Sequence, residues 1–164
     1  MQDLGTLGGN RSEAYDLNNY GTVVGESKTA SDETHAFIWR DGAIEDLGTL
    51  GGSFSRATGI NDQGEVVGMS STSSGENHAF IWSDGQMRDL GTLGGNWSMA
   101  LAINEKGQVA GEAKVAGGAV HGALWKTRWA FEGGSSLDRP LIASGSDLDL
   151  TLRQDCPSRA LRAP

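Results

Sequence analysis

The sequence repeats itself with a fixed period of 43 residues. The heptapeptide DLGTLGG stands at residues 3–9, 46–52 and 89–95, whereas residues 132–138 read EGGSSLD. HAFIW at 35–39 and 78–82 becomes HGALW at 121–125, and VVG at 23–25 and 66–68 becomes VAG at 109–111. Because neither period contains an insertion, equivalent residues are expected to meet equivalent neighbours in every unit. The chain is therefore predicted to be an array of similar units.

Each unit predicts four short β-strands and no helix. Short apolar runs alternate with turn signals, and none keeps an apolar period of 3.6 residues for the length of a helix. In the first unit the expected strands are residues 12–18, 22–27, 35–39 and 43–47. An Asn-x-x-Gly turn is expected after the first strand, and an Asp-Gly turn at residues 41–42 is expected after the third.

Four antiparallel strands in one 43-residue unit are typical of a β-propeller blade. We therefore expect an all-β chain of three blades, at about residues 12–48, 55–91 and 98–134 of the sequence. A parallel β-solenoid is the alternative repeat fold, but it would not need two hairpin turns in each unit.

The ends of the repeat array are complementary. Residues 2–5 have the sequence of a fourth strand but follow no blade, and the third blade has no regular fourth strand. We expect the N-terminal strand of one copy to complete the third blade of another, which closes a homodimer into a six-bladed ring. The alternative is that residues 129–134 form an imperfect fourth strand and the array stays open.

Charge divides the chain near residue 125. Residues 1–125 carry 7 Lys and Arg against 16 Asp and Glu, whereas residues 126–164 carry 6 against 5, which gives the whole chain a net charge of −8. Residues 126–164 are expected to be an irregular C-terminal tail that is partly disordered. Because phosphates are bound by Lys and Arg, the acidic repeats predict neither a nucleic-acid partner nor a membrane partner.

The single cysteine, Cys156, excludes an intrachain disulfide framework and a cysteine-based zinc site. Met1 is followed directly by fourth-strand sequence, without the charged and apolar regions of a signal peptide. The chain as given is therefore expected to be cytoplasmic.

The recurring segments together resemble a known family. HAFIW and DLGTLGG, with an Asn-x-x-Gly turn and a Val-Val-Gly strand between them, are similar to the HAF-repeat proteins of bacteria and archaea over about residues 2–125. The resemblance implies a β-propeller-like array and an extracellular location for a longer parent protein. It implies no catalytic residues.

Histidine and tryptophan recur once in each unit. The histidines begin apolar strands, so they are expected to have a structural role in which each ring nitrogen bonds a backbone group or a carboxylate. The tryptophans are expected to pack between blades. These residues are His35, His78, His121, Trp39, Trp82 and Trp125.

Amide and carboxylate side chains gather around the first hairpin of each unit. If the first strand is innermost, this hairpin lies at one mouth of a central channel and its oxygens could bind a ligand or Ca²⁺. The candidates are Asp16, Asn18, Glu26, Asn61, Asp62, Asn104, Glu105 and Glu112. Asp16, Asp62 and Glu105 are the calcium candidates among them. The alternative is a solvated acidic rim.

Two functions remain open at this point. No nucleophile elbow, phosphate loop or zinc-protease motif is present, which favours a module that binds a small molecule or a glycan at the channel mouth. The alternative is a calcium-dependent hydrolase of lactones or esters, such as acyl-homoserine lactones, because a Ca²⁺ site of this kind leaves no short linear motif. The catalytic residues are unknown in either case.

Overall fold

The computed structural model describes residues 1–127, and in this part of the chain the all-β prediction is confirmed. Eleven strands fall into three groups, which we call the first, second and third units. The first unit contains β1 (Gly8–Leu17), β2 (Val23–Thr29), β3 (Thr34–Arg40) and β4 (Ala43–Asp46). The second contains β5 (Gly51–Ile60), β6 (Val66–Thr72), β7 (Asn77–Ser83) and β8 (Gln86–Asp89). The third contains β9 (Gly94–Ile103), β10 (Gln108–Val115) and β11 (Val120–Lys126).

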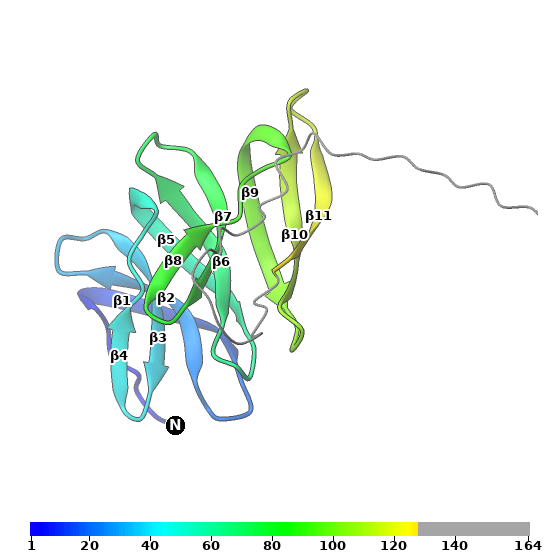
Figure 1. The fold of residues 1–164 in the computed structure, drawn as a ribbon. Helices are drawn as coiled ribbons and strands as arrows, with labels where there is room; N and C mark the ends of the chain where they lie inside the picture. Colours follow the sequence, from blue (N-terminus) through cyan, green and yellow to red (C-terminus); the bar gives the residue numbers. More distant parts are fainter. Residues whose placement is uncertain (128–164) are drawn as a thin grey trace, which may run out of the picture.

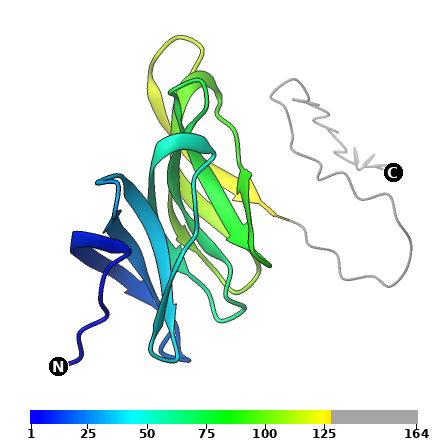
Figure 2. The same ribbon diagram turned by 90° about the vertical axis from the view of Figure 1, so that its left-hand side faces the viewer.

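Neighbouring strands within a unit pair in antiparallel fashion, in the order of the sequence. Consecutive units are joined by a single parallel bridge, Thr34 to Phe54 and then Asn77 to Trp97. The result is one open arrangement of 11 strands with β1 near one end and β11 at the other. Figures 1 and 2 show the three units stacked side by side, each turned relative to the one before.

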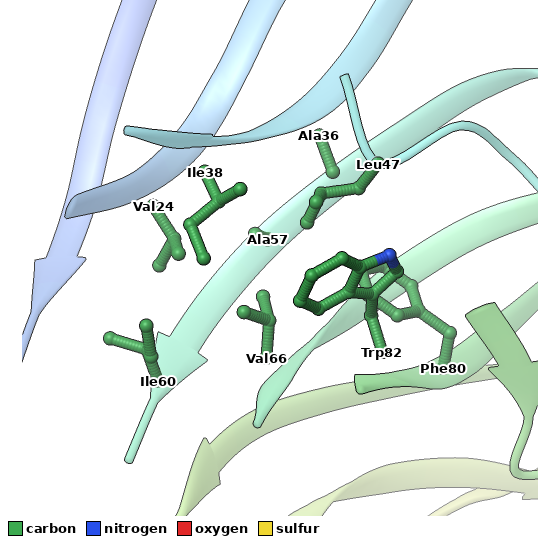
Figure 3. Close-up of a cluster of buried hydrophobic side chains, with 9 residues drawn as sticks. All are labelled: Val24, Ala36, Ile38, Leu47, Ala57, Ile60, Val66, Phe80 and Trp82. Carbon is green, nitrogen blue, oxygen red and sulfur yellow. The ribbon is translucent and has the colours of Figure 1, made fainter. Parts of the chain in front are cut away.

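The hydrophobic core lies between the units. Between the first and second units, Val24, Ala36, Ile38 and Leu47 pack against Ala57, Ile60, Val66, Phe80 and Trp82 (Figure 3). Between the second and third units, Val67, Ala79 and Ile81 pack against Ala100 and Val109, with Trp125 at the margin. The second unit therefore buries one face against the first unit and the other against the third.

The predicted turns are present with the expected backbone geometry. Asp41 and Gly42 both have positive φ, 52° and 83°, as a two-residue hairpin turn of the primed type requires. At the first hairpin, the Asn18 side-chain oxygen accepts from the backbone of Tyr20, and the Gly21 backbone N–H donates to the Asn18 carbonyl. Asn and Gly thus close this turn as the sequence predicts.

The first strand of each unit begins earlier than expected. Residues 8 and 9, which lie before the strand predicted at 12–18, belong to β1, and Gly8 lies opposite Thr29 of β2. A register shift between Ala14 and Asp16 then brings the carbonyl of Glu13 against Gly25, where an added Cβ would lie 1.9 Å from that oxygen. This close approach is the physical reason for a glycine at this position of every unit.

The two ends of the stack expose faces that are buried inside it. Ile38 is 1% exposed against the second unit, whereas its equivalent in the third unit, Leu124, is 60% exposed. At the other end Leu17 is 65% exposed, whereas its equivalent Ile60 is 6% exposed. The stack therefore ends in apolar side chains on both sides.

Two predictions concern residues outside the described part of the chain. These are the irregular tail from residue 128 onward and the imperfect fourth strand at 129–134. Within residues 1–127 there is no helix that could cross a membrane.

Candidate functional site

The recurring heptapeptide forms a turn that is held by its own side chains. Asp46 Oδ1 accepts from the Gly48 backbone N–H at 2.8 Å, and Thr49 Oγ1 donates to the Gly52 carbonyl at 2.8 Å. Gly48 has a φ of 73°, a left-handed conformation that other residues rarely adopt. Residues 3–9 and 89–95 make the same contacts.

The second carboxylate oxygen of this aspartate faces the histidine of the third strand. His35 Nδ1 lies 2.8 Å from Asp46 Oδ2, and His78 Nδ1 lies 2.7 Å from Asp89 Oδ2. A carboxylate is the kind of partner that the sequence predicts for these rings. The His–Asp pair thus fastens the fourth strand of a unit to its third strand.

The other ring nitrogen points to a second acidic group at a longer distance. His35 Nε2 lies 3.6 Å from Glu33 Oε2, and His78 Nε2 lies 3.7 Å from Glu76 Oε2. Both Nε2 atoms are buried and make no hydrogen bond. Because solvent and substrate do not reach these atoms, we assign the pair a structural role.

The third unit lacks this pair within the described residues. His121 is exposed on β11, and the position equivalent to Asp46 and Asp89 is Glu132, outside the described part of the chain. At the opposite end, Asp3 forms the turn with Gly5 at 2.9 Å but has no histidine beside it. Each end of the stack therefore holds one half of a His–Asp pair.

A row of asparagines joins the first hairpins of the three units. The Asn18 amide donates to the Asn61 carbonyl at 3.2 Å, and the Asn61 amide donates to the Asn104 carbonyl at 3.2 Å. Asn18 and Asn61 are buried, and their side-chain oxygens also close their own turns. The ligand candidates Asn18, Asn61 and Asn104 are brought together, but their side chains are used to connect the units.

The first hairpins of the three units together form an edge that we call the rim. The residue that follows each asparagine, at positions 19, 62 and 105, forms a second row of hydrogen bonds along this rim. Asp62 accepts from the Asn19 side-chain amide at 2.7 Å and from the Asn19 backbone at 3.0 Å. Glu105 in turn accepts from the Asp62 backbone at 3.2 Å. The donation from the Asn19 amide and backbone lowers the pKa of Asp62 below its ordinary value.

The other acidic candidates contact the neighbouring unit or lie at the open end. Asp16 accepts from the Ile60 backbone at 2.9 Å, and Glu26 accepts from Arg56 Nε at 2.6 Å. This hydrogen bond to Glu26 raises the pKa of Arg56, whose guanidinium also lies over the Tyr15 ring at 5.4 Å. Glu112 lies on β10, on the third unit, which has no successor within the described residues.

Metal binding gains no support from this geometry. Among residues 1–127 no group of three His, Cys, Asp or Glu side chains is placed to hold a metal ion. Of the three calcium candidates, Asp16, Asp62 and Glu105, each has a carboxylate oxygen bonded to a backbone N–H of another unit. Calcium at this rim stays a prediction.

A shallow hollow opens beside the rim, between the first and second units. It is lined by Arg40, Glu45, Gln63, Gly64, Trp82, Asp84 and Gly85. The β3–β4 hairpin contributes its charges from one side, and the two turns of the second unit contribute from the other. The lining combines both signs of charge with an amide.

One set of connecting residues was missed at the sequence level. Ser55 Oγ accepts from the Ala36 backbone at 2.8 Å and donates to the Gly48 carbonyl at 2.5 Å. Ser98 makes the equivalent contacts with Ala79 and Gly91. Serine recurs at residues 12, 55 and 98, so the 43-residue period carried a signal that could have identified them.

Comparisons with known proteins give no further lead. No protein-family model matches the chain, and neither the curated proteins nor the solved structures contain a match. The function is therefore argued from the geometry alone.

Proposed function

We propose that this protein is a β-propeller repeat module of three blades per chain, and that it binds a small molecule or a glycan at the rim of its first hairpins. Two copies close into a six-bladed ring. The observation that carries the proposal is the hydrogen-bonded rim, which holds equivalent turns of the three units side by side, together with the hollow of mixed polar lining that lies beside it between the first and second units.

The contacts between first strands support the propeller arrangement. In a propeller the first strand of each blade lies nearest the central axis, so first strands of adjacent blades approach one another. Thr58 Oγ1 of β5 donates to the Ala100 carbonyl of β9 at 2.8 Å. A Cβ added to Gly59 would lie 3.3 Å from the Ala102 Cα of β9.

The exposed end faces support closure by a second copy. Inside the chain, the face that holds Ile38 packs on the face that holds Ile60. The equivalent residues Leu124 and Leu17 occupy the two open ends. A repeat array needs such faces covered, and three units are too few to close a propeller.

The hollow at the rim suits a neutral polar ligand. Arg40 Nη2 and Glu45 Oε2 form an ion pair at 3.1 Å, which leaves the other guanidinium N–H groups as donors and the other carboxylate oxygen as an acceptor. Asp84 supplies further acceptors, and the Gln63 amide, which donates to the Glu105 carbonyl at 3.3 Å, keeps its oxygen and its second N–H. A ligand with many hydroxyl groups can use donors and acceptors at once, whereas a ligand of one charge would meet repulsion from one side. A sugar is therefore the ligand class that we favour over an anion.

Nuclear magnetic resonance provides the test. We expect neutral oligosaccharides, presented singly to ¹⁵N-labelled protein, to shift the amide signals of Gln63, Gly64 and Gly85. Arg40→Ala should weaken the binding of any such sugar, whereas Lys28→Ala, on the opposite end of β2 from the first hairpin, should leave it unchanged. A panel of sugars that leaves the rim amides unmoved would overturn the ligand assignment.

Calcium-dependent hydrolysis of lactones or esters stays a prediction, because no feature of residues 1–127 favours it over binding. Turnover of an acyl-homoserine lactone that is lost on chelation and restored by Ca²⁺ would support it.

A further inference from the structure

We infer that residues 2–5 of a second copy add as the missing outer strand beside β11, where Asp3 of that copy pairs with His121. This inference rests on the proposed ring and names its contacts. The third unit is then complete only in the dimer, because Asp3 of the second copy supplies the acidic half of its His–Asp pair.

The turn that holds Asp3 has the same local geometry as the turn that holds the aspartate of a complete His–Asp pair. Asp3 Oδ1 accepts from the Gly5 backbone at 2.9 Å, and Asp89 Oδ1 accepts from the Gly91 backbone at 2.7 Å. Gly5 has a φ of 78° and Gly91 a φ of 70°. Residues 3–5 therefore already hold the conformation of a docked segment, which lowers the entropy cost of binding.

A backbone hydrogen bond accompanies each complete pair, and its donor and acceptor equivalents likewise lie at opposite ends of the stack. The Leu90 backbone N–H donates to the Ala79 carbonyl at 2.9 Å, which pairs the segment after β8 with β7. The equivalents of these two residues are Leu4 and Gly122. Within residues 1–127 β11 pairs only with β10, so among the described strands its outer edge has no partner, and we assign residues 2–5 of the second copy to it.

A serine makes two hydrogen bonds inside the stack, but its equivalent in the first unit makes only one. Ser98 Oγ accepts from the Ala79 backbone and donates to the Gly91 carbonyl, whereas Ser12 Oγ makes only the donation, to the Gly5 carbonyl at 2.8 Å. The donor that Ser12 lacks is the backbone N–H equivalent to Ala79, which is Gly122 at the far end of the stack.

The rim carries one more unfinished contact. The Asn61 amide donates both to Glu65 in its own turn and to the Asn104 carbonyl of the next unit. The Asn104 amide donates only to Gln108 in its own turn, at 2.8 Å. Docking of a second copy offers it the carbonyl of that copy's Asn18.

A second copy fits these sites better than the chain's own N-terminal segment. β1 and β11 lie at opposite ends of the stack (Figure 1). A second copy is favoured because equivalent positions of consecutive units, occupied by apolar residues, already form the two interfaces inside the chain.

Disulfide trapping tests the register. Ile38 lies opposite Glu45, so Leu124 should lie opposite Gln2 of the second copy. In a full-length chain with Cys156→Ser, we expect Gln2→Cys with Leu124→Cys to oxidise to a covalent dimer. Gln2→Cys with Val120→Cys is the matched control, because Val120 lies four residues away on β11, roughly 13 Å along the strand.

Association constants test the pair. Deletion of residues 2–5 should weaken dimerisation by roughly 100-fold or more, because several hydrogen bonds are lost together. Asp3→Ala and His121→Ala should each weaken it by about 10-fold, and the double variant should lose little more than either single variant. Asp41→Asn, at an exposed acidic residue in the turn between β3 and β4, should have no effect.

The outcomes separate this inference from the proposed function. A dimer that survives the deletion unchanged, or that cross-links equally through position 120, overturns the strand addition but leaves the ring. A chain that is monomeric at all concentrations overturns both the ring and the strand addition, and shows that the ends are covered by something else. A mass that rises beyond two copies overturns the closed ring.

Discussion

His78 Nδ1 lies 2.7 Å from Asp89 Oδ2, eleven residues further along the chain. This contact joins the two most regular segments of the repeat, because the histidine belongs to HAFIW and the aspartate belongs to DLGTLGG. The aspartate also holds the turn that leads into the next unit, through the Gly91 backbone. One carboxylate therefore connects the strands of one unit to the start of the following one.

His78→Ala and Asp89→Ala are each expected to lower the free energy of unfolding by about 1–3 kcal/mol, because the remaining partner loses a half-buried hydrogen bond. Asp89→Ala should cost more than His78→Ala, since it also removes the acceptor for Gly91. Urea unfolding at pH 7 measures both values.

The double variant provides the control for this pair. If the contact is real, the double variant should be more stable than the sum of the two single losses predicts. Strictly additive losses would show that the two side chains contribute independently.

Phe80→Ala is expected to lower the free energy of unfolding by about 3–5 kcal/mol, because the ring is fully buried between the first and second units. Tyr20→Ala, which removes an aromatic ring that is 78% exposed, should change stability by less than about 0.5 kcal/mol. A urea midpoint that is unchanged by Phe80→Ala would contradict the assignment of the core.

Gly68→Ala is expected to disrupt the second unit. An added Cβ would lie 1.9 Å from the carbonyl oxygen of Arg56, a backbone atom that cannot move without breaking the β5–β6 pairing. We expect a loss of several kcal/mol, or about 3 kcal/mol at the least. Gly117→Ala is the matched control, because an added Cβ would meet nothing within 4 Å. The free energy of unfolding of this variant should be nearly unchanged.

Asp62 is expected to titrate below its ordinary pKa of 3.8 in the folded protein, because Asn19 donates to its carboxylate. A depressed folded pKa means that the unfolded chain binds the proton more tightly. The stabilisation is therefore complete above the unfolded pKa, and it is lost as the pH falls from about 4 through the folded pKa.

Carboxyl ¹³C shifts followed against pH measure this titration. Asn19→Ala removes the larger cause, so it should move the pKa of Asp62 back toward 3.8. An identical midpoint in the variant would show that the Asn19 side chain does not hold the carboxylate.

Local features of this fold were predictable because they depend on neighbours in sequence. The turn at Asp41 and Gly42 needs two positive φ angles, which Asp and Gly tolerate, so the dipeptide alone indicates it. The short apolar run at 36–39 indicates β3 for the same reason. The start of β1 was placed too late, at residue 12, because glycines such as those at 8 and 9 do not favour a strand by themselves and their pairing with β2 is not visible in the sequence.

The 43-residue period predicted that equivalent residues meet equivalent neighbours, but it did not predict which atoms of two units form hydrogen bonds. Asn61 was identified as a turn residue, and its bond to its own turn follows from local geometry. Its second bond, to Asn104, depends on how the units stack. The acidic side chains of the rim were expected to converge, yet Asp62 and Glu105 bond to backbone groups of preceding units instead.

The sequence by itself determined the all-β class, the strand order and the unit length, because strands and tight turns follow from residue types within a few positions of one another. Only the tertiary structure decided that Asn18 joins Asn61, that Ser55 joins Ala36, and which faces of the first and second units are buried by the unit that follows. The physical reason is that these contacts depend on the packing angle between sheets. That angle is set by side chains from two units at once, and no single stretch of sequence contains it.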